Sequence, residues 1–179
     1  MLSDKMLYTR RVASDAVMLV LALVFSYIEA ILPLELLFPL PGFKLGLANI
    51  VITVLVWRIS LVDAAVVSAL RVLIMGLLFG SPVSMMFSFG GALLSFAALA
   101  LLRGVGGQLF SFVGISVLSA AAHNLGQLIC AGVLFGAAAI LSYLPFLLIA
   151  SAVFGTVSGL LLNALLPQLE KIKLGDLGK

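Results

Sequence analysis

The chain has 179 residues, of which 64% are hydrophobic and 9% are charged, with a formal net charge of +3. A soluble domain carries roughly 25% charged residues, so this composition excludes a water-soluble fold and predicts a multi-spanning membrane protein. Cys130 is the single cysteine, which excludes an intramolecular disulfide and a thiolate metal cluster, and the small basic excess does not indicate nucleic-acid binding.

Apolar runs divide the chain into six predicted membrane-spanning helices, because about 20 apolar residues are needed to cross the hydrocarbon core. The predicted spans are 12–32, 42–57, 61–79, 83–102, 110–136 and 142–167. Proline and glycine separate most of them, whereas the break near Leu141 has no such signal. The span 42–57 is short, which allows a start inside a re-entrant bend. We therefore expect an all-α fold formed by one six-helix transmembrane domain.

The basic residues predict how this bundle is oriented. An even number of spans places both termini on one side, and eight of the ten basic residues fall on that side. They are Lys5, Arg10, Arg11, Arg58, Arg103, Lys171, Lys173 and Lys179. By the positive-inside rule we expect cytoplasmic termini in a bacterial plasma membrane. Glu29 and Glu35 fall in or near the first loop of the opposite side.

The two remaining basic residues are Lys44 and Arg71. Arg71 lies midway along span 61–79, about 13 Å from the end at Gly80 by the helical rise. An arginine at this depth should face the bundle interior or a water-filled cavity. An internal ion pair or snorkelling remains an alternative for Arg71, and Lys44 can also snorkel from the mouth of span 42–57.

The motif AAHNLGQLI holds three polar side chains within five residues, in a run without charges. His123 and Gln127 are four residues apart and Asn124 and Gln127 are three apart, so one helix face presents all of them. These groups form either a binding face or contacts that hold helices together. No metal site is predicted, since His123 is the single histidine and no cysteine or carboxylate is spaced to assist it.

Two further motifs carry small or polar residues. In PGFKLGLANIV, Gly42 and Gly46 permit close approach, and Asn49 lies about 10 Å below the outer surface. FSFGGALLS is a small polar patch that tight helix packing would also explain.

Similar depths in the membrane lead us to predict one ligand pocket that binds a small solute and needs no cofactor. Its predicted residues are Lys44, Asn49, Arg71, His123, Asn124 and Gln127. The cationic groups favour a carboxylate or phosphate on the solute.

In these motifs the chain resembles the heptaprenyl diphosphate synthase component I family, also called the Gx transporter family, from about residue 12 to 167. That family is similar to the substrate-binding S components of energy-coupling-factor transporters. This resemblance implies solute capture and docking onto a transmembrane coupling subunit with two ATPases. S components use an AxxxA pattern for docking, and the corresponding small residues here are Ala22, Ser26, Ala30, Ala65 and Ala69. Packing within the chain would use the same residues.

The synthase name implies a different chemistry, which the sequence does not support as an independent activity. Prenyl diphosphate synthases hold magnesium with a DDxxD motif, and no two aspartates are adjacent here. The chain also has no P-loop of the form GxxxxGK[ST], so ATP hydrolysis would need partner subunits. Three functions stay open: solute capture for uptake, a non-catalytic membrane component beside a soluble prenyl synthase subunit, and a structural subunit of a membrane complex.

Overall fold

The computed structural model describes residues 2–32, 46–105 and 110–171, and all regular secondary structure in these ranges is helical. The helices are α1 (Leu2–Ile31), α3 (Asn49–Arg58), α4 (Leu61–Phe79), α5 (Pro82–Gly104), α6 (Phe112–Phe135) and α7 (Ala137–Lys171). The all-α class predicted from the sequence is therefore confirmed.

Five of these helices, all except α3, are long and apolar enough to cross a membrane. Their outward faces carry large apolar side chains, such as the exposed Val20, Leu73 and Leu161, as a surface against lipid requires. The predicted span 42–57 is the one that differs. Helix α3 has 10 residues, a length of about 15 Å, and so covers roughly half of a hydrocarbon core. The first residues of the predicted span 42–57 lie outside the described ranges.

Serine residues and one glycine set the helix boundaries. Ser60, Ser81 and Ser111 each accept a hydrogen bond from a backbone amide in the first turn of α4, α5 and α6. The first backbone amides of a helix have no carbonyl partner within the helix, and the serine hydroxyl supplies an acceptor for one of them. Helix α6 ends at Gly136, whose φ of 93° is in the region that favours glycine. The chain therefore breaks at Gly136, and not near Leu141 as expected.

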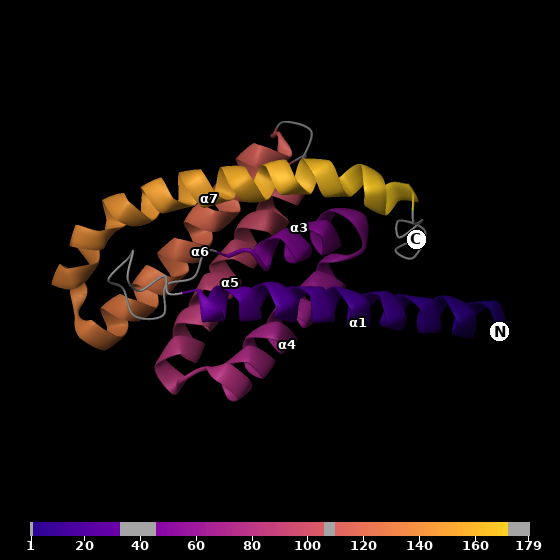
Figure 1. Cartoon of the computed structure of the whole chain (residues 1–179), viewed down its shortest axis with the longest axis horizontal. Coiled ribbons are helices and arrows are strands. Elements are labelled where there is room, and N and C mark those ends of the chain that lie inside the picture. Colours follow the sequence, from indigo (N-terminus) through magenta and orange to yellow (C-terminus); the bar gives the residue numbers. More distant parts are fainter. Residues whose placement is uncertain (1, 33–45, 106–109, 172–179) are drawn as a thin grey trace.

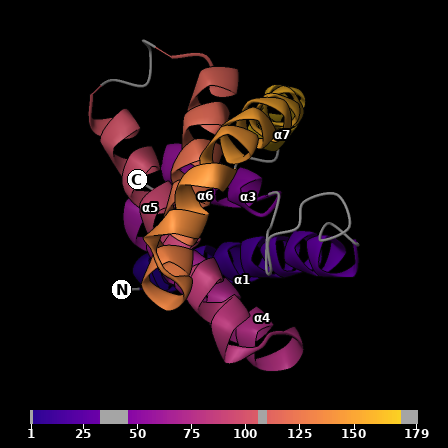
Figure 2. The ribbon, with the colours of Figure 1, turned by 90° about the vertical axis from the view of Figure 1, so that its left-hand side faces the viewer.

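Helix α3 forms the centre of the hydrophobic core. Every residue from Asn49 to Val56 is buried, and α3 packs against all five other helices. Figures 1 and 2 show α1 and α4 on one side of the bundle and α6 and α7 on the other, with α3 and α5 between them. Leu99, Ile115 and Leu162 complete the core from α5, α6 and α7.

One end of the bundle, which we call the basic end, holds the start of α1 and the end of α7 (Figure 1). Arg11 donates from Nε and Nη2 to the two carboxylate oxygens of Asp63 at 2.9 and 2.8 Å, and this pair joins α1 to α4. Arg103 donates to the Val56 carbonyl and so ties α5 to the end of α3. Arg10 and Arg58 lie close in sequence to these contacts, so all the arginines of the described residues except Arg71 lie at this end.

Glycine contacts bring α5, α6 and α7 into close packing. A Cβ added at Gly126 would lie 2.2 Å from the Gly90 carbonyl oxygen, so the backbones of α5 and α6 touch at this crossing. Helix α7 touches the α6 backbone in the same way. A Cβ added at Gly155 would lie 2.5 Å from Val117 Cα, and one added at Gly159 would lie 2.4 Å from Val113 Cα. Such close approach is how helices gain packing energy in lipid.

Candidate functional site

Arg71 lies deep in the bundle with an incomplete set of partners. It is 5% exposed and sits eight residues before the end of α4 at Phe79, a distance of about 12 Å. Its Nη1 donates to Ser26 Oγ of α1 at 3.4 Å, which is long for a hydrogen bond. Its Nε has no hydrogen-bond partner among the described residues. A buried guanidinium with so few partners is unusual, because burial of a charge is costly unless it is paired.

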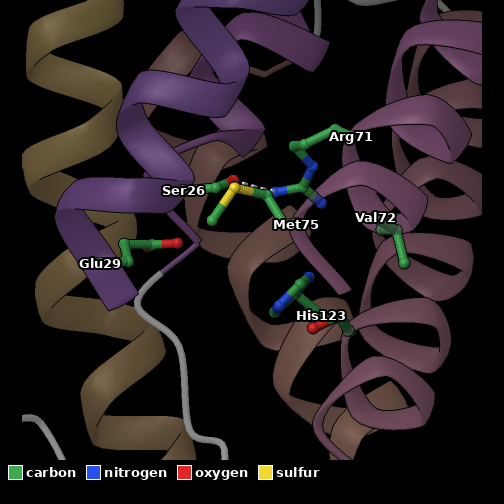
Figure 3. A pocket seen from close by; sticks show the side chains of 7 residues that line it. Ser26, Glu29, Arg71, Val72, Met75 and His123 are labelled. Carbon is green, nitrogen blue, oxygen red and sulfur yellow. Dashed lines mark hydrogen bonds between the residues drawn. The ribbon is translucent and has the colours of Figure 1, made fainter. Parts of the chain in front are cut away.

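Arg71 lines a cavity that we call the charged cavity. Its other lining residues are Ser26, Glu29, Val72, Met75, Ser88 and His123. Figure 3 shows Glu29 and Ser26 entering from α1, Arg71 and Met75 from α4, and His123 from α6. The walls bound about 290 Å³ including the open mouth, and the interior itself holds about one water molecule. Met75 is unbranched and adaptable, so its movement is the simplest way to enlarge this space.

His123 reaches the cavity because α5 has a glycine opposite it. The ring is 2% exposed, and a Cβ added at Gly91 would lie 2.7–2.9 Å from three of its ring atoms. Gly91 therefore supplies the room in which the imidazole sits. Gln127 follows one turn later, with its Nε2 at 3.3 Å from His123 Nε2. Gln127 thus contacts His123 and does not itself line the charged cavity.

Asn49 lies in a second cavity, which we call the hydroxyl cavity. This cavity is lined by Gly46, Asn49, Thr53, Ser116, Ser119 and Ser158, together with apolar Ile50 and Ala120. Asn49 is 8% exposed, and its Nδ2 has no hydrogen-bond partner among the described residues. The predicted pocket is thus divided: Arg71 and His123 share one cavity, and Asn49 lies in the other.

Asn124 is directed toward α7 and away from both cavities. Its Nδ2 donates to Ser151 Oγ at 2.9 Å and lies 3.4 Å from the Leu147 carbonyl, while Ser151 donates to the same carbonyl at 2.6 Å. These contacts match the alternative in which amides hold helices together. Lys44, the remaining predicted binding residue, lies outside the described residues.

The small residues predicted for partner docking occupy two different environments. Ala22 and Ser26 are buried against the chain's own helices, with 0% and 5% exposure. Ala30 is exposed at the end of α1. On α4, Ala65 is half-buried and Ala69 is exposed, so this pair can meet another helix. Ser26 instead contributes to the charged cavity.

Glu29 is the site residue that the sequence interpretation placed elsewhere. It was expected near the loop, but it is 3% exposed inside α1, and its Oε1 accepts a hydrogen bond from the Leu47 amide at 2.5 Å. The spacing of Ala22, Ser26 and Glu29 on one helix face was the available signal, because residues three and four apart share a face. The charged cavity therefore contains a carboxylate beside the guanidinium of Arg71.

The charged cavity has the chemical groups of a binding site. Across the described residues, no group of three His, Cys, Asp or Glu side chains could hold a metal ion. A guanidinium, an imidazole, two hydroxyls and the carboxylate of Glu29 converge from four helices on one small space, and the donors among them outnumber the one carboxylate. Such a set can fix a carboxylate or phosphate through charge-assisted hydrogen bonds.

Comparison with known proteins gives one match. The model of the family described as heptaprenyl diphosphate synthase component I matches residues 18–165, which include α3 to α6 and the residues of both cavities. Neither a curated protein nor a solved structure matches the chain. Because the family model covers most of the sequence, this chain belongs to the heptaprenyl diphosphate synthase component I family.

Proposed function

We propose that this chain is a non-catalytic membrane protein that binds the anionic group of a small solute in the charged cavity. The observation that carries the proposal is Arg71: a guanidinium 5% exposed, with one long hydrogen bond and an unpaired Nε among the described residues. Retaining such a group is unfavourable for the folded state alone. A carboxylate or phosphate of a solute would supply the missing acceptors.

Capture for uptake is the form of binding that this proposal favours. In this form the chain would act like an S component: it would hold the solute in the membrane, and a coupling subunit with two ATPases would drive its transport. The exposed side of α4 at Ala65 and Ala69 supports docking, since small residues let a second helix approach closely. The cluster of arginines at the basic end supports an orientation with that end cytoplasmic, in a bacterial plasma membrane.

A thermal-shift screen of the detergent-purified chain tests the binding step. The panel contains inorganic phosphate, diphosphate, carboxylate-bearing vitamins, nucleobases, flavin precursors and prenyl diphosphates. A compound that binds only the folded state at 100 times its Kd should add about 2.7 kcal/mol of stability. The expected result is stabilisation by a phosphate or carboxylate compound that is lost in Arg71→Ala and reduced in Arg71→Lys, because lysine lacks the planar fork. Stabilisation that is equal in wild type and Arg71→Ala would overturn the proposal.

A second candidate function is supported by the family match. The name of the family implies a second component of the synthase, so the chain would act as a membrane component beside a soluble prenyl synthase subunit. Its test is co-purification of the intact chain with a soluble DDxxD-bearing synthase from the same organism. A stable complex whose synthase activity depends on this chain, with no solute binding in the screen, would favour this second function over capture.

A further inference from the structure

The hydroxyl cavity has a chemistry of its own that the charged cavity does not share. Its polar residues are one amide and four hydroxyl side chains, and none of the described residues that line it is charged. They come from α3, α6 and α7, whereas the charged cavity is lined from α1, α4, α5 and α6. Asn49, Thr53, Ser119 and Ser158 are each at least nine-tenths buried.

Asn49 provides an independent sign of a ligand. Its side chain is 8% exposed, it lines the cavity, and its Nδ2 lacks a partner among the described residues. A buried donor without an acceptor loses the hydrogen bonds it would make with water, so the folded state gains nothing from it. An acceptor oxygen in the cavity would restore them.

The backbone next to Asn49 keeps this space open. Gly46 has a φ of 79°, which side-chain-bearing residues rarely adopt, and a Cβ added there would lie 3.1 Å from Asn49 Nδ2. The backbone N–H of Asn49 donates to the Gly46 carbonyl at 2.8 Å, and this hydrogen bond fixes the turn. The turn therefore presents the amide group of Asn49 without covering it.

Lining residues of the two cavities lie close together along the chain at two places. Gly46 lines the hydroxyl cavity, and the next residue, Leu47, donates its amide to Glu29 of the charged cavity at 2.5 Å. On α6, Ala120 of the hydroxyl cavity and His123 of the charged cavity are three residues apart, a rise of about 4.5 Å. Because each cavity alone holds about one water molecule, a solute that reaches both must displace the side chains between them.

We infer that the hydroxyl cavity is a second, uncharged subsite that binds a hydroxyl or carbonyl oxygen of the solute whose anionic group is held at Arg71. This inference rests on the proposed function and adds the substrate class: a small polyoxygenated anion, with its neutral oxygens directed to Asn49 and the serines of α6 and α7. The polar walls distinguish such a molecule from one whose neutral part is a hydrocarbon chain.

Two probes that differ only in hydroxyl groups test the subsite. Glycerol phosphate and propyl phosphate share a phosphate on three carbons, and only the first carries free hydroxyls. We expect wild type to bind glycerol phosphate about three- to tenfold more tightly, the effect of one added hydrogen bond. Asn49→Leu, which keeps the side-chain size, should bring the ratio of the two Kd values close to one while both phosphates still bind. Arg71→Met should abolish binding of both.

Matched controls separate this subsite from a general loss of structure. Asn124→Leu changes a buried asparagine that lies outside both cavities and should leave the ratio at its wild-type value. Ser158→Ala alters the cavity from α7 and should lower the ratio if Asn49→Leu does not fold. Equal affinities in wild type, or a preference that survives in both cavity variants, would overturn the inference while leaving the charged site intact. If neither phosphate binds wild type, the subsite inference fails, and if no carboxylate or phosphate of the screening panel binds either, the proposed function fails with it.

Discussion

The buried polar groups at the α6–α7 interface and those between α1 and α4 differ in how fully they are hydrogen-bonded. In the first, Asn124 donates to Ser151, and Ser151 in turn donates to a carbonyl, so the hydrogen bonds form a closed chain. In the second, Arg71 makes one long hydrogen bond, and its Nε has no partner in the part of the chain that the structure describes. Only the second region borders a cavity with charged walls. The difference shows that depth in the membrane does not by itself identify a binding residue; unfilled hydrogen-bonding capacity beside open space does.

The packing also differs between these regions. Helices α5, α6 and α7 meet through glycines at backbone contact, whereas α1 and α4 meet through side chains: Arg11 with Asp63, Ser26 with Arg71, and Tyr27 with Phe79 at a ring separation of 5.1 Å. Side-chain contacts can rearrange without moving a backbone. We therefore expect the α1–α4 side to be the one that adjusts when a solute enters.

The largest predicted effect tests the rigid region. Gly126→Ala places a methyl group 2.2 Å from the Gly90 carbonyl oxygen, so the backbones of α5 and α6 must separate. We expect a loss of about 3 kcal/mol or more in the free energy of unfolding, measured by denaturant titration in detergent. Gly104→Ala is the matched control, because nothing lies within 4 Å of its added Cβ. Equal stability of the two variants would contradict the described crossing.

A smaller effect is predicted at the basic end. Asp63→Asn removes the carboxylate that pairs with Arg11, whose side chain is 39% exposed and can turn to water. We expect a loss of about 1–2 kcal/mol, less than for a fully buried pair. A double-mutant cycle with Arg11→Met measures the coupling. A coupling energy near zero would show that the pair does not hold α1 against α4.

The next smaller effect concerns the hydrogen bonds between α6 and α7. Asn124→Leu leaves Ser151 without its donor, and we expect a loss of about 0.6–1 kcal/mol with unchanged solute binding. Ser151→Ala should give a similar loss of stability. The double variant should lose less than the sum of the two single losses, because both residues belong to one set of hydrogen bonds. If Asn124→Leu instead abolishes binding at unchanged stability, Asn124 belongs to the binding site and the contrast between the two regions is incorrect.

The sequence predicts the helical membrane fold and the special position of Arg71 for a simple reason: charge and hydropathy act locally along the chain. It predicts less well what depends on contacts between distant residues. Asn124 and Gln127 share a helix face in the sequence pattern, yet one contacts α7 and the other His123, because that face borders two neighbours. The direction of Glu29 into the bundle likewise depends on its contact with Leu47.

The length of α3 also differs from the length predicted from the sequence. Residues 42–57 are apolar enough to suggest a spanning helix, but the helix begins at Asn49, after the turn that Gly46 initiates at positive φ. Apolar composition indicates burial, and α3 is buried by other helices instead of by lipid. The division of the predicted pocket into two cavities follows from this turn, since it places Asn49 beside α6 and α7.

The central claim is that Arg71 is retained for a ligand and not for the fold, and the most direct test is the stability of Arg71→Met without any solute. The variant is combined with Glu29→Gln, because Arg71→Met alone would leave the buried Glu29 carboxylate without the cation beside it. The double variant removes both buried charges at similar volume, so the account predicts a free energy of unfolding equal to or higher than that of wild type. The comparison uses the same detergent and includes Asn124→Leu as the variant expected to lose stability. A loss of several kcal/mol in the double variant would contradict the account and identify Arg71 as a structural residue that joins α4 to α1.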